Sequence, residues 1–498
     1  MIPLALIKKH PKGKLSEMRV MEANPIIVGS ALNPHSNQKN SPSQNAGLVI
    51  NNGYERRSSL TLYIPENVDI DRLLVENPPN CRLERDYLVY ILHLITAIPA
   101  RKRDTIKEYN GFTTINKKLL QKRIHDYKVY FDYLLQNSII LEDGFYIVGK
   151  KSVGYKIRNP SPILKPVIIT KRTLIKSILH LHKNYSVKLT EKYGFLKKWF
   201  NNNVKVDYEG AIKFLEDLKF QEIQNGNTEN INLRYNCRML PILKLRDQNF
   251  SFYVDDSGYR LHTNFTQMKS ELRNFCTYKD EKLCAIDVKN CQLYLAISLL
   301  DDELFIKNDI TSMIVNPSLT NQPNYPIMLV DLIRSIKNEP DVLLFKEWAS
   351  TGFFYENFGK LLVEKDILDK DEPNLRNKVK EITFISIYSH NNQAPHVKEI
   401  RIFKEFFPNV FKVFSKIKFG KKYHNALSLC LQRLESKLVI DKSCRKISQK
   451  YPFAPIYTIH DSIVTTERHV GFIKSELYNV LKESIGTTPS LKIERWES

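Results

Sequence analysis

One short stretch near the C-terminus constrains the fold more than any other part of the sequence. Residues 457–464, Tyr-Thr-Ile-His-Asp-Ser-Ile-Val, form two β-branched and aromatic runs that meet at His460-Asp461-Ser462. This pattern predicts a β-hairpin with a carboxylate at its tip. A strand pair holds a side chain rigidly, as a metal-binding carboxylate requires. Because Asp and Ser are also common in ordinary turns, this stretch indicates a functional site only in combination with two other stretches.

A second stretch places another aspartate at the end of a strand. Residues 283–297 read Leu-Cys-Ala-Ile-Asp-Val-Lys-Asn-Cys-Gln-Leu-Tyr-Leu-Ala-Ile. The apolar residues 284–286 predict a buried strand that ends at Asp287. An apolar helical face follows, formed by Leu293, Ala296, Ile297 and Leu300. Strand ends are common positions for bound ligands and metals, so we expect Asp287 to lie at a site.

The third stretch carries cations and aromatic residues at helical spacing. Four residues recur at every fourth position of 375–388: Arg376, Lys380, Phe384 and Tyr388. Four residues advance about 400° along an α-helix, so this row winds slowly along one face. Such a face can bind a triphosphate at its cationic end and a base or sugar at its aromatic end. Core packing of the two aromatic side chains and solvent exposure of the two cations are the simpler alternative.

Together, the three stretches resemble the polymerase motifs of the family A nucleic-acid polymerases, which include DNA polymerase I-like enzymes and single-subunit phage and mitochondrial RNA polymerases. Asp287 falls where that family has its first catalytic aspartate, and His460-Asp461 match its last motif. The row on 375–388 matches the fingers helix at all four spacings. The order of the motifs is that of the family, and the resemblance covers roughly residues 235–498.

The resemblance implies an α+β fold shaped as a right hand, with a thumb, a palm built on an antiparallel sheet, and helical fingers. It also implies two Mg²⁺ ions held by Asp287, Asp461 and the Val288 carbonyl, since Mg²⁺ prefers oxygen ligands. Lys380 then acts on the triphosphate during catalysis. The resemblance assigns Arg376, Phe384, Tyr388 and Gln292 to nucleotide binding. It assigns Arg260, Arg273, Gln432 and His460 to the primer–template.

The charge balance favours a nucleic-acid partner. The chain of 498 residues has a formal net charge of +21 and an isoelectric point near 9.4. Such a surplus suits a polyanion, with an anionic membrane surface as the rival partner. No apolar run of about 18 residues predicts a spanning helix. Seven cysteines without a CxxC pair indicate free thiols in a reducing compartment, so we expect a soluble intracellular protein.

The chain divides into segments of different composition. Residues 30–59 are rich in Asn, Ser and Pro, which predicts a linker. Helical spacing at 120–134, followed by a hairpin predicted at 139–148 about Asp143-Gly144, suggests a winged-helix nucleic-acid module, although a plain α+β domain fits equally well. We predict a basic flexible N-terminal tail and linker (1–59), a winged-helix-like module (60–158), a basic thumb-like helical region (159–233), the first part of the palm (234–300), fingers (301–396) and the second part of the palm (397–498).

Several functions stay open at this point. The lead is template-dependent DNA synthesis from nucleoside triphosphates on a DNA primer–template, since Phe384 and Gln292 favour deoxyribonucleotides. His-Asp-Ser is closer to the single-subunit RNA polymerases, so RNA synthesis is an alternative, and a non-catalytic DNA-binding replication initiator is another. Tyr253-Val-Asp-Asp256 resembles the reverse-transcriptase tetrapeptide, but Asp255-Asp-Ser-Gly258 is also an ordinary turn. No set of exonuclease carboxylates stands out, so proofreading is not predicted.

Overall fold

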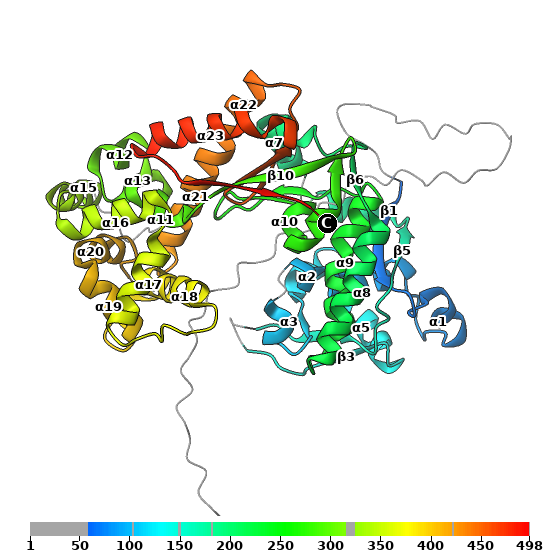
Figure 1. Ribbon diagram of the computed structural model, residues 1–498. Helices are drawn as coiled ribbons and strands as arrows, with labels where there is room; N and C mark the ends of the chain where they lie inside the picture. Colours follow the sequence, from blue (N-terminus) through cyan, green and yellow to red (C-terminus); the bar gives the residue numbers. More distant parts are fainter. Residues whose placement is uncertain are drawn as a thin grey trace, which may run out of the picture.

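The computed structural model describes residues 58–101, 104–147, 151–180, 183–314, 324–420 and 423–497. Almost all of the predicted N-terminal tail and linker therefore lies outside the described residues. The described chain has mixed α+β structure with antiparallel sheets. In Figure 1, the N-terminal elements with α8 (Tyr208–Gln224) and α9 (Ile231–Arg246) form one lobe. The helices from α11 (Cys291–Ala296) to α20 (Pro408–Ile417) form a second, and the largest sheet with α21 (Ala426–Ser436) and α23 (Val470–Ile485) joins the two.

The first part of the described chain is a small α+β unit. Its elements are β1 (Leu60–Pro65), α1 (Ile70–Glu76), α2 (Arg85–Arg101), α3 (Asp104–Glu108), β2 (Thr113–Thr114), α4 (Lys117–Gln121), α5 (Tyr127–Gln136), β3 (Ile140–Glu142) and β4 (Gly154–Ile157). Strands β2, β4 and β3 form a three-stranded antiparallel sheet in that order. The apolar face of α2 lies in the core of this unit.

The hairpin predicted at 139–148 is wrong in its pairing. Strand β3 pairs with β4, which begins only at Gly154. The reason is the Asp143 side chain, which accepts hydrogen bonds from the N–H groups of Phe145 (3.1 Å) and Gly154 (2.9 Å) and pairs with Lys151 (2.6 Å). These contacts fix a longer connection in place of the tight Asp-Gly turn.

The predicted thumb is tied to the elements on both sides of it. It contains β5 (Leu164–Ile169), α6 (Arg172–His180), α7 (Lys183–Lys197), β6 (Val204–Val206) and α8 (Tyr208–Gln224), and α9 (Ile231–Arg246) crosses its far boundary. Strand β5 pairs with β1 of the N-terminal unit, and β6 pairs with β9 (Cys276–Tyr278) of the largest sheet. Several of its cations are bound within the protein: Lys171 pairs with Glu84 (2.9 Å) and Lys192 with Asp441 (3.1 Å).

The largest sheet is antiparallel and six-stranded, and β10 (Glu281–Val288) is at its centre. Its other strands are β6, β9 (Cys276–Tyr278), β11 (Tyr457–Ile459), β12 (Ser462–Thr466) and β13 (Leu491–Arg495). Strand β10 pairs with β12 on one side and with β13 and β9 on the other. Its residues 283–286 are buried, as the apolar run predicts.

The second lobe is helical. It is formed by α11 (Cys291–Ala296), α12 (Asp302–Lys307), α13 (Ile310–Met313), α15 (Tyr325–Ile336), α16 (Pro340–Thr351), α17 (Phe354–Glu364), α18 (Leu375–Tyr388), α19 (Lys398–Phe406) and α20 (Pro408–Ile417). Its core holds three fully buried rings, Phe345, Phe354 and Phe407, with centroids 5.2–5.8 Å apart. Because α19 and α20 bury their phenylalanines here, the lobe extends beyond residue 396, the predicted end of the fingers.

The chain returns to the sheet through a long helical segment. Helix α21 (Ala426–Ser436) continues through π-helical turns at Lys437–Cys444 into α22 (Arg445–Lys450), and α23 (Val470–Ile485) follows β12. Helix α21 packs on α11, and α23 packs on the π-helical turns. This arrangement brings α21 beside the helix that follows Asp287.

A short hairpin precedes the sheet and forms the turn that contains Tyr253-Val-Asp-Asp256. Strands β7 (Phe252–Val254) and β8 (Leu261–Thr263), followed by α10 (Asn264–Gln267), make a two-stranded sheet of their own. The Asp255 carboxylate accepts hydrogen bonds from the N–H groups of Ser257 (3.0 Å), Gly258 (2.6 Å) and Arg260 (3.0 Å). Asp255 thus stabilises the turn, and the reverse-transcriptase alternative has no support from this geometry.

Candidate active site

The two predicted catalytic aspartates lie on neighbouring strands. Strand β12 pairs with β10 with Ile463 opposite Ile286, and β11 and β12 form the predicted hairpin, so that prediction is confirmed. The Ser462 hydroxyl donates a hydrogen bond of 2.6 Å to Asp287, although these residues are 175 positions apart in the chain. Asp461 directly precedes Ser462 in the turn. The sheet therefore brings Asp287 and Asp461 together.

The electrostatics of Asp461 reflect this proximity. Burial raises the pKa of the Asp461 carboxyl to about 7, and the negative charges of Asp287 and Glu435 contribute to the rise. Two carboxylates in a poorly solvated place repel each other, so a bound cation stabilises them. A strongly perturbed pKa beside another carboxylate is typical of functional sites.

The donor set suits a hard cation such as Mg²⁺. Among the described residues, no group of three or more His, Cys, Asp or Glu side chains is arranged to bind a metal. Asp287 and Asp461 are the two carboxylates that the strand pairing brings together, and Val288 ends β10 next to them, paired with Leu491 of β13. Mg²⁺ commonly binds through one or two carboxylates and completes its coordination with water and substrate phosphates, so these residues fit the ion.

The predicted row on α18 lies outside the core of the helical lobe. Helix α18 spans Leu375–Tyr388, as the spacing predicts, and its buried residues are Val379, Ile382, Thr383, Ser386 and Ile387. Arg376 and Lys380 are exposed, whereas Phe384 and Tyr388 are half-buried. Another face of the helix fills the core, although Tyr388 also packs against the edge of that core.

The cations of this row have partners within the lobe. Arg376 forms an ion pair of 2.8 Å with Glu356 and lies 5.3 Å from the centre of the Tyr355 ring. The Lys380 ammonium lies 5.6 Å from the Phe384 ring centre. Both side chains of the Arg376–Glu356 pair are well exposed, 54% and 39%, and such pairs contribute about 0–1 kcal/mol. An incoming anion can therefore displace Glu356 at low cost.

One residue to which the sequence analysis assigned no role links Gln292, the contact of α18, to the β7–β8 turn. Glu435 on α21 is 1% exposed and accepts two hydrogen bonds of 2.9 Å from Arg260. It also accepts a hydrogen bond from the Gln292 amide on α11. The Tyr388 hydroxyl of α18 in turn donates to the Gln292 side-chain oxygen at 3.4 Å. Burial raises the pKa of Glu435, against the opposing effects of Arg260 and Gln292.

A sequence signal for Glu435 exists in hindsight. On α21, Leu427, Leu431 and Leu434 are buried, and Glu435 follows Leu431 by one helical turn on the same face. A charged residue on a buried helix face requires a partner. The sequence does not show which cation supplies it, since Arg260 is 175 positions away.

The residues predicted to contact a primer–template have well-defined neighbours. Arg260 is paired with Glu435, and Arg273 donates to the carbonyls of Phe265 (3.2 Å) and Met268 (3.3 Å). These guanidinium groups are engaged within the protein, so a phosphate contact requires their remaining N–H groups or a rearrangement.

Gln432 and His460 lie at the two ends of this region. The Gln432 side chain packs against the Gly258 turn, where a Cβ atom would lie 2.5 Å from the amide oxygen. His460 adopts the left-handed conformation (φ +55°) at the tip of its hairpin and is accessible to solvent. The protein around the ring limits its hydration and so lowers the pKa of His460, with contributions from Arg260, His262 and Arg273. A neutral imidazole at this place can accept a hydrogen bond at neutral pH.

Comparisons with known proteins returned no match, either to a protein-family model or to a curated protein. None of the helices in the part of the chain that the structure describes is long and apolar enough to cross a membrane.

Proposed function

We propose that this chain is a template-dependent DNA polymerase that adds deoxynucleoside triphosphates to a primer 3′-hydroxyl. The observation that supports this most is the joining of Asp287, Asp461 and the α18 row into one region. Asp287 and Asp461 are adjacent on the sheet, and Tyr388 of α18 contacts Gln292, which follows Asp287 by five positions. Long-range packing therefore brings the C-terminal end of α18 near the strand that carries Asp287, which supports the resemblance to family A polymerases.

The residues have distinct roles in the proposed reaction. The primer 3′-hydroxyl loses its proton to solvent, and its oxygen forms a bond to the α-phosphorus of the nucleotide. The bond from that phosphorus to the α–β bridging oxygen breaks, and pyrophosphate leaves. Two Mg²⁺ ions held by Asp287, Asp461 and the Val288 carbonyl would supply activation of the attacking oxygen and stabilisation of the leaving group. Lys380 neutralises the triphosphate and gives a proton to the departing pyrophosphate, and Arg376 binds the terminal phosphates after leaving Glu356.

The half-buried end of α18 positions the nucleoside. Phe384 and Tyr388 stack on the incoming base and the template position, and Gln292 lies against C2′ of the sugar, where it excludes a ribose hydroxyl. Glu435 orients Gln292 by accepting a hydrogen bond from its amide, so that the Gln292 oxygen faces Tyr388. His460 and Arg260 then contact the primer end.

The direct test is extension of a primed DNA template by the purified full chain with Mg²⁺, comparing deoxynucleotides with ribonucleotides. We expect deoxynucleotide incorporation that requires both template and primer and is lost in Asp287→Asn. The exposed Asp256→Asn in the β7–β8 turn serves as the control. Retention of near-wild-type synthesis by folded Asp287→Asn would place the chemistry elsewhere.

Synthesis of RNA is the second candidate. The sequence His-Asp-Ser, with Ser462 in place of the glutamate of His-Asp-Glu, resembles the single-subunit RNA polymerases. The Ser462 hydroxyl donates a hydrogen bond to Asp287. Incorporation of ribonucleotides alone in the same assay would favour this candidate. Metal-independent DNA binding without any pyrophosphate release would instead favour a replication initiator.

The N-terminal unit fits a DNA-binding role within this proposal. Its order α2, α3, β2, α4, α5, β3, β4 and its sheet order β2-β4-β3 support the winged-helix-like module that the sequence suggests. We propose that it contacts the template through phosphates, with Lys117, Lys118 and Lys122 on and beside α4. Such binding weakens steeply with added salt, so template affinity that is insensitive to salt or to removal of residues 1–158 would contradict this role.

A further inference from the structure

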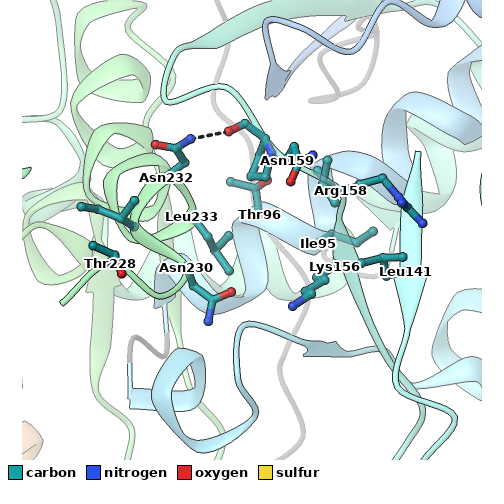
Figure 2. A pocket seen from close by; sticks show the side chains of 13 residues that line it. Ile95, Thr96, Leu141, Lys156, Arg158, Asn159, Thr228, Asn230, Asn232 and Leu233 are labelled. Atoms are coloured by element: carbon teal, nitrogen blue, oxygen red, sulfur yellow. Dashed lines mark hydrogen bonds between the residues drawn. The ribbon is translucent and has the colours of Figure 1, made fainter. Parts of the chain in front are cut away.

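A cavity far along the chain from the catalytic aspartates lies between the N-terminal unit and the start of α9. Its volume is about 300 Å³, at the lower end of the range of small-ligand pockets. Figure 2 shows its lining, which comes from α2, from β3 and β4 with the residues after β4, and from the beginning of α9. None of the residues assigned to the polymerase site belongs to it.

The charge of the lining is one-sided. Lys156 and Arg158 are among the 13 lining residues, and none of the 13 is Asp or Glu. Within the described part of the chain, neither cation has a carboxylate partner. The Lys156 ammonium lies 4.5 Å from the centre of the Phe112 ring, and in Figure 2 its chain extends toward the Asn230 side of the cavity. The charge of this wall favours the binding of an anion.

The start of α9 adds to this positive potential. The N-cap residue Asn230 has φ +52°, and its side chain makes no capping hydrogen bond. Its amide donates instead to the Asn110 side-chain oxygen at 3.0 Å. The first N–H groups of a 16-residue helix thus remain uncapped by a side chain next to the cavity, where the helix dipole favours negative charge.

Two unpaired polar atoms point to a missing partner. Thr96 on α2 is 1% exposed and lines the cavity, yet its hydroxyl has no hydrogen-bond partner. A threonine within a helix usually bonds back to the preceding turn, so an unpaired hydroxyl there is unusual. The Asn232 amide donates to the Pro160 carbonyl at 2.8 Å, but its buried oxygen is also unpaired.

The lining also includes apolar side chains. Ile95, Ile157 and Leu233 contribute to it, beside the polar residues Asn159, Thr228 and Asn230. A ligand that satisfies all three features has a negatively charged group, a flat apolar body and polar atoms at the edge of that body. A nucleotide has these parts in one small molecule.

We propose that this cavity is a second nucleotide site, which binds one 5′-phosphorylated nucleotide unit. The phosphate lies at the start of α9 near Lys156, the base lies between the apolar side chains, and its edge bonds with Thr96 and Asn232. The unit is either a free nucleotide or the unpaired terminal nucleotide of a strand. This cavity site is separate from the proposed polymerase site, and the proposal does not depend on whether the chain synthesises DNA.

The test is calorimetric titration of the full chain with deoxyadenosine monophosphate, in the Asp461→Asn background to suppress turnover. Deoxyadenosine without phosphate and inorganic phosphate are titrated separately. We expect saturable binding of the nucleotide that is weakened about tenfold by Lys156→Gln, as loss of one charge-assisted hydrogen bond predicts. Lys128→Gln, an exposed change on α5 outside the cavity, leaves it unchanged.

Thr96→Val supplies an independent arm, because it replaces the unpaired hydroxyl by a methyl group of similar size. We expect this variant to melt at a higher temperature than the parent without ligand and to bind the nucleotide more weakly. The proposal is overturned by absence of saturable binding, by inorganic phosphate binding as tightly as the nucleotide, or by an affinity that Lys156→Gln does not change.

Competition identifies the source of the nucleotide. If deoxyadenosine monophosphate displaces a labelled 5′-phosphorylated single strand, and Lys156→Gln weakens that strand, the ligand is a strand end. If neither deoxyadenosine monophosphate nor Lys156→Gln weakens strand binding while the free nucleotide still binds, the ligand of the cavity is the free nucleotide. Either outcome supports the site, and loss of primer extension in other variants does not bear on it.

Discussion

Replacing Asp461 by asparagine should stabilise the metal-free protein while abolishing synthesis. The pKa of the Asp461 carboxyl rises from 3.8 to about 7 on folding, because the site is poorly solvated and Asp287 lies beside it. Each pH unit of such a difference corresponds to about 1.4 kcal/mol. The ionised carboxylate therefore destabilises the folded state by up to about 4 kcal/mol, and asparagine cannot ionise.

The pH dependence has a definite sign. Below about pH 4 the folded and unfolded states both hold the proton, so ionisation costs nothing. Between about pH 4 and about pH 7 the unfolded state has lost the proton that the folded state keeps, so stability falls as the pH rises. Above the folded pKa of about 7 the full penalty remains. The advantage of Asp461→Asn should thus be small near pH 4.5 and largest at pH 8.

Urea denaturation in EDTA at the two pH values measures this advantage. Trp199 and Trp496 are buried beside the sheet and report its unfolding by fluorescence. Adding Mg²⁺ should stabilise the wild type more than the variant, since a ligand stabilises only the state that binds it. The exposed Asp256→Asn is the matched control. An unchanged stability difference at pH 4.5 and pH 8, or a less stable Asp461→Asn at pH 8, would refute the reasoning.

Three further substitutions test Lys380 of the α18 row, the carboxylate paired with Arg376, and the carboxylate that orients Gln292. Lys380→Ala should lower kcat by about 10²-fold or more, because a cation and proton donor to the leaving group is lost; single-turnover extension would show an undiminished rate if the assignment is wrong. Glu356→Gln should lower KM for the nucleotide by about two- to fivefold at low salt, because it frees Arg376 from a pair that contributes about 0–1 kcal/mol, and an increase in KM would contradict this. Glu435→Gln should raise ribonucleotide incorporation relative to deoxynucleotide incorporation by about tenfold, since it weakens a charge-assisted hydrogen bond that orients Gln292. This ratio does not depend on the fraction of the protein that folds. Gln292→Ala is the reference variant. An unchanged ratio in Glu435→Gln beside a raised one in Gln292→Ala would show that Glu435 does not act on selectivity.

Local patterns predicted the elements that carry the site. The β-branched runs predicted the β11–β12 hairpin, the apolar run predicted β10, which ends at Val288, one residue beyond the predicted Asp287, and the spacing of the row predicted α18. Each of these depends on neighbours within one or two turns or strand lengths, which the sequence displays directly. The hairpin predicted at 139–148 is wrong because its pairing depends on a contact beyond this local range. Asp143 accepts a hydrogen bond from Gly154, which is 11 positions away.

The sequence by itself determined the basic charge, an aspartate near the end of β10, another at the tip of the β11–β12 hairpin, and the cationic and aromatic face of α18. Only the tertiary structure decided that Asp287 and Ser462 meet across 175 positions, that Glu435 binds Arg260 and Gln292, and that Thr96 faces a cavity beside α9. The physical reason is that hydrogen-bond preferences and hydrophobic periodicity act locally. The partners of a buried charge or hydroxyl are chosen by the packing of the whole chain.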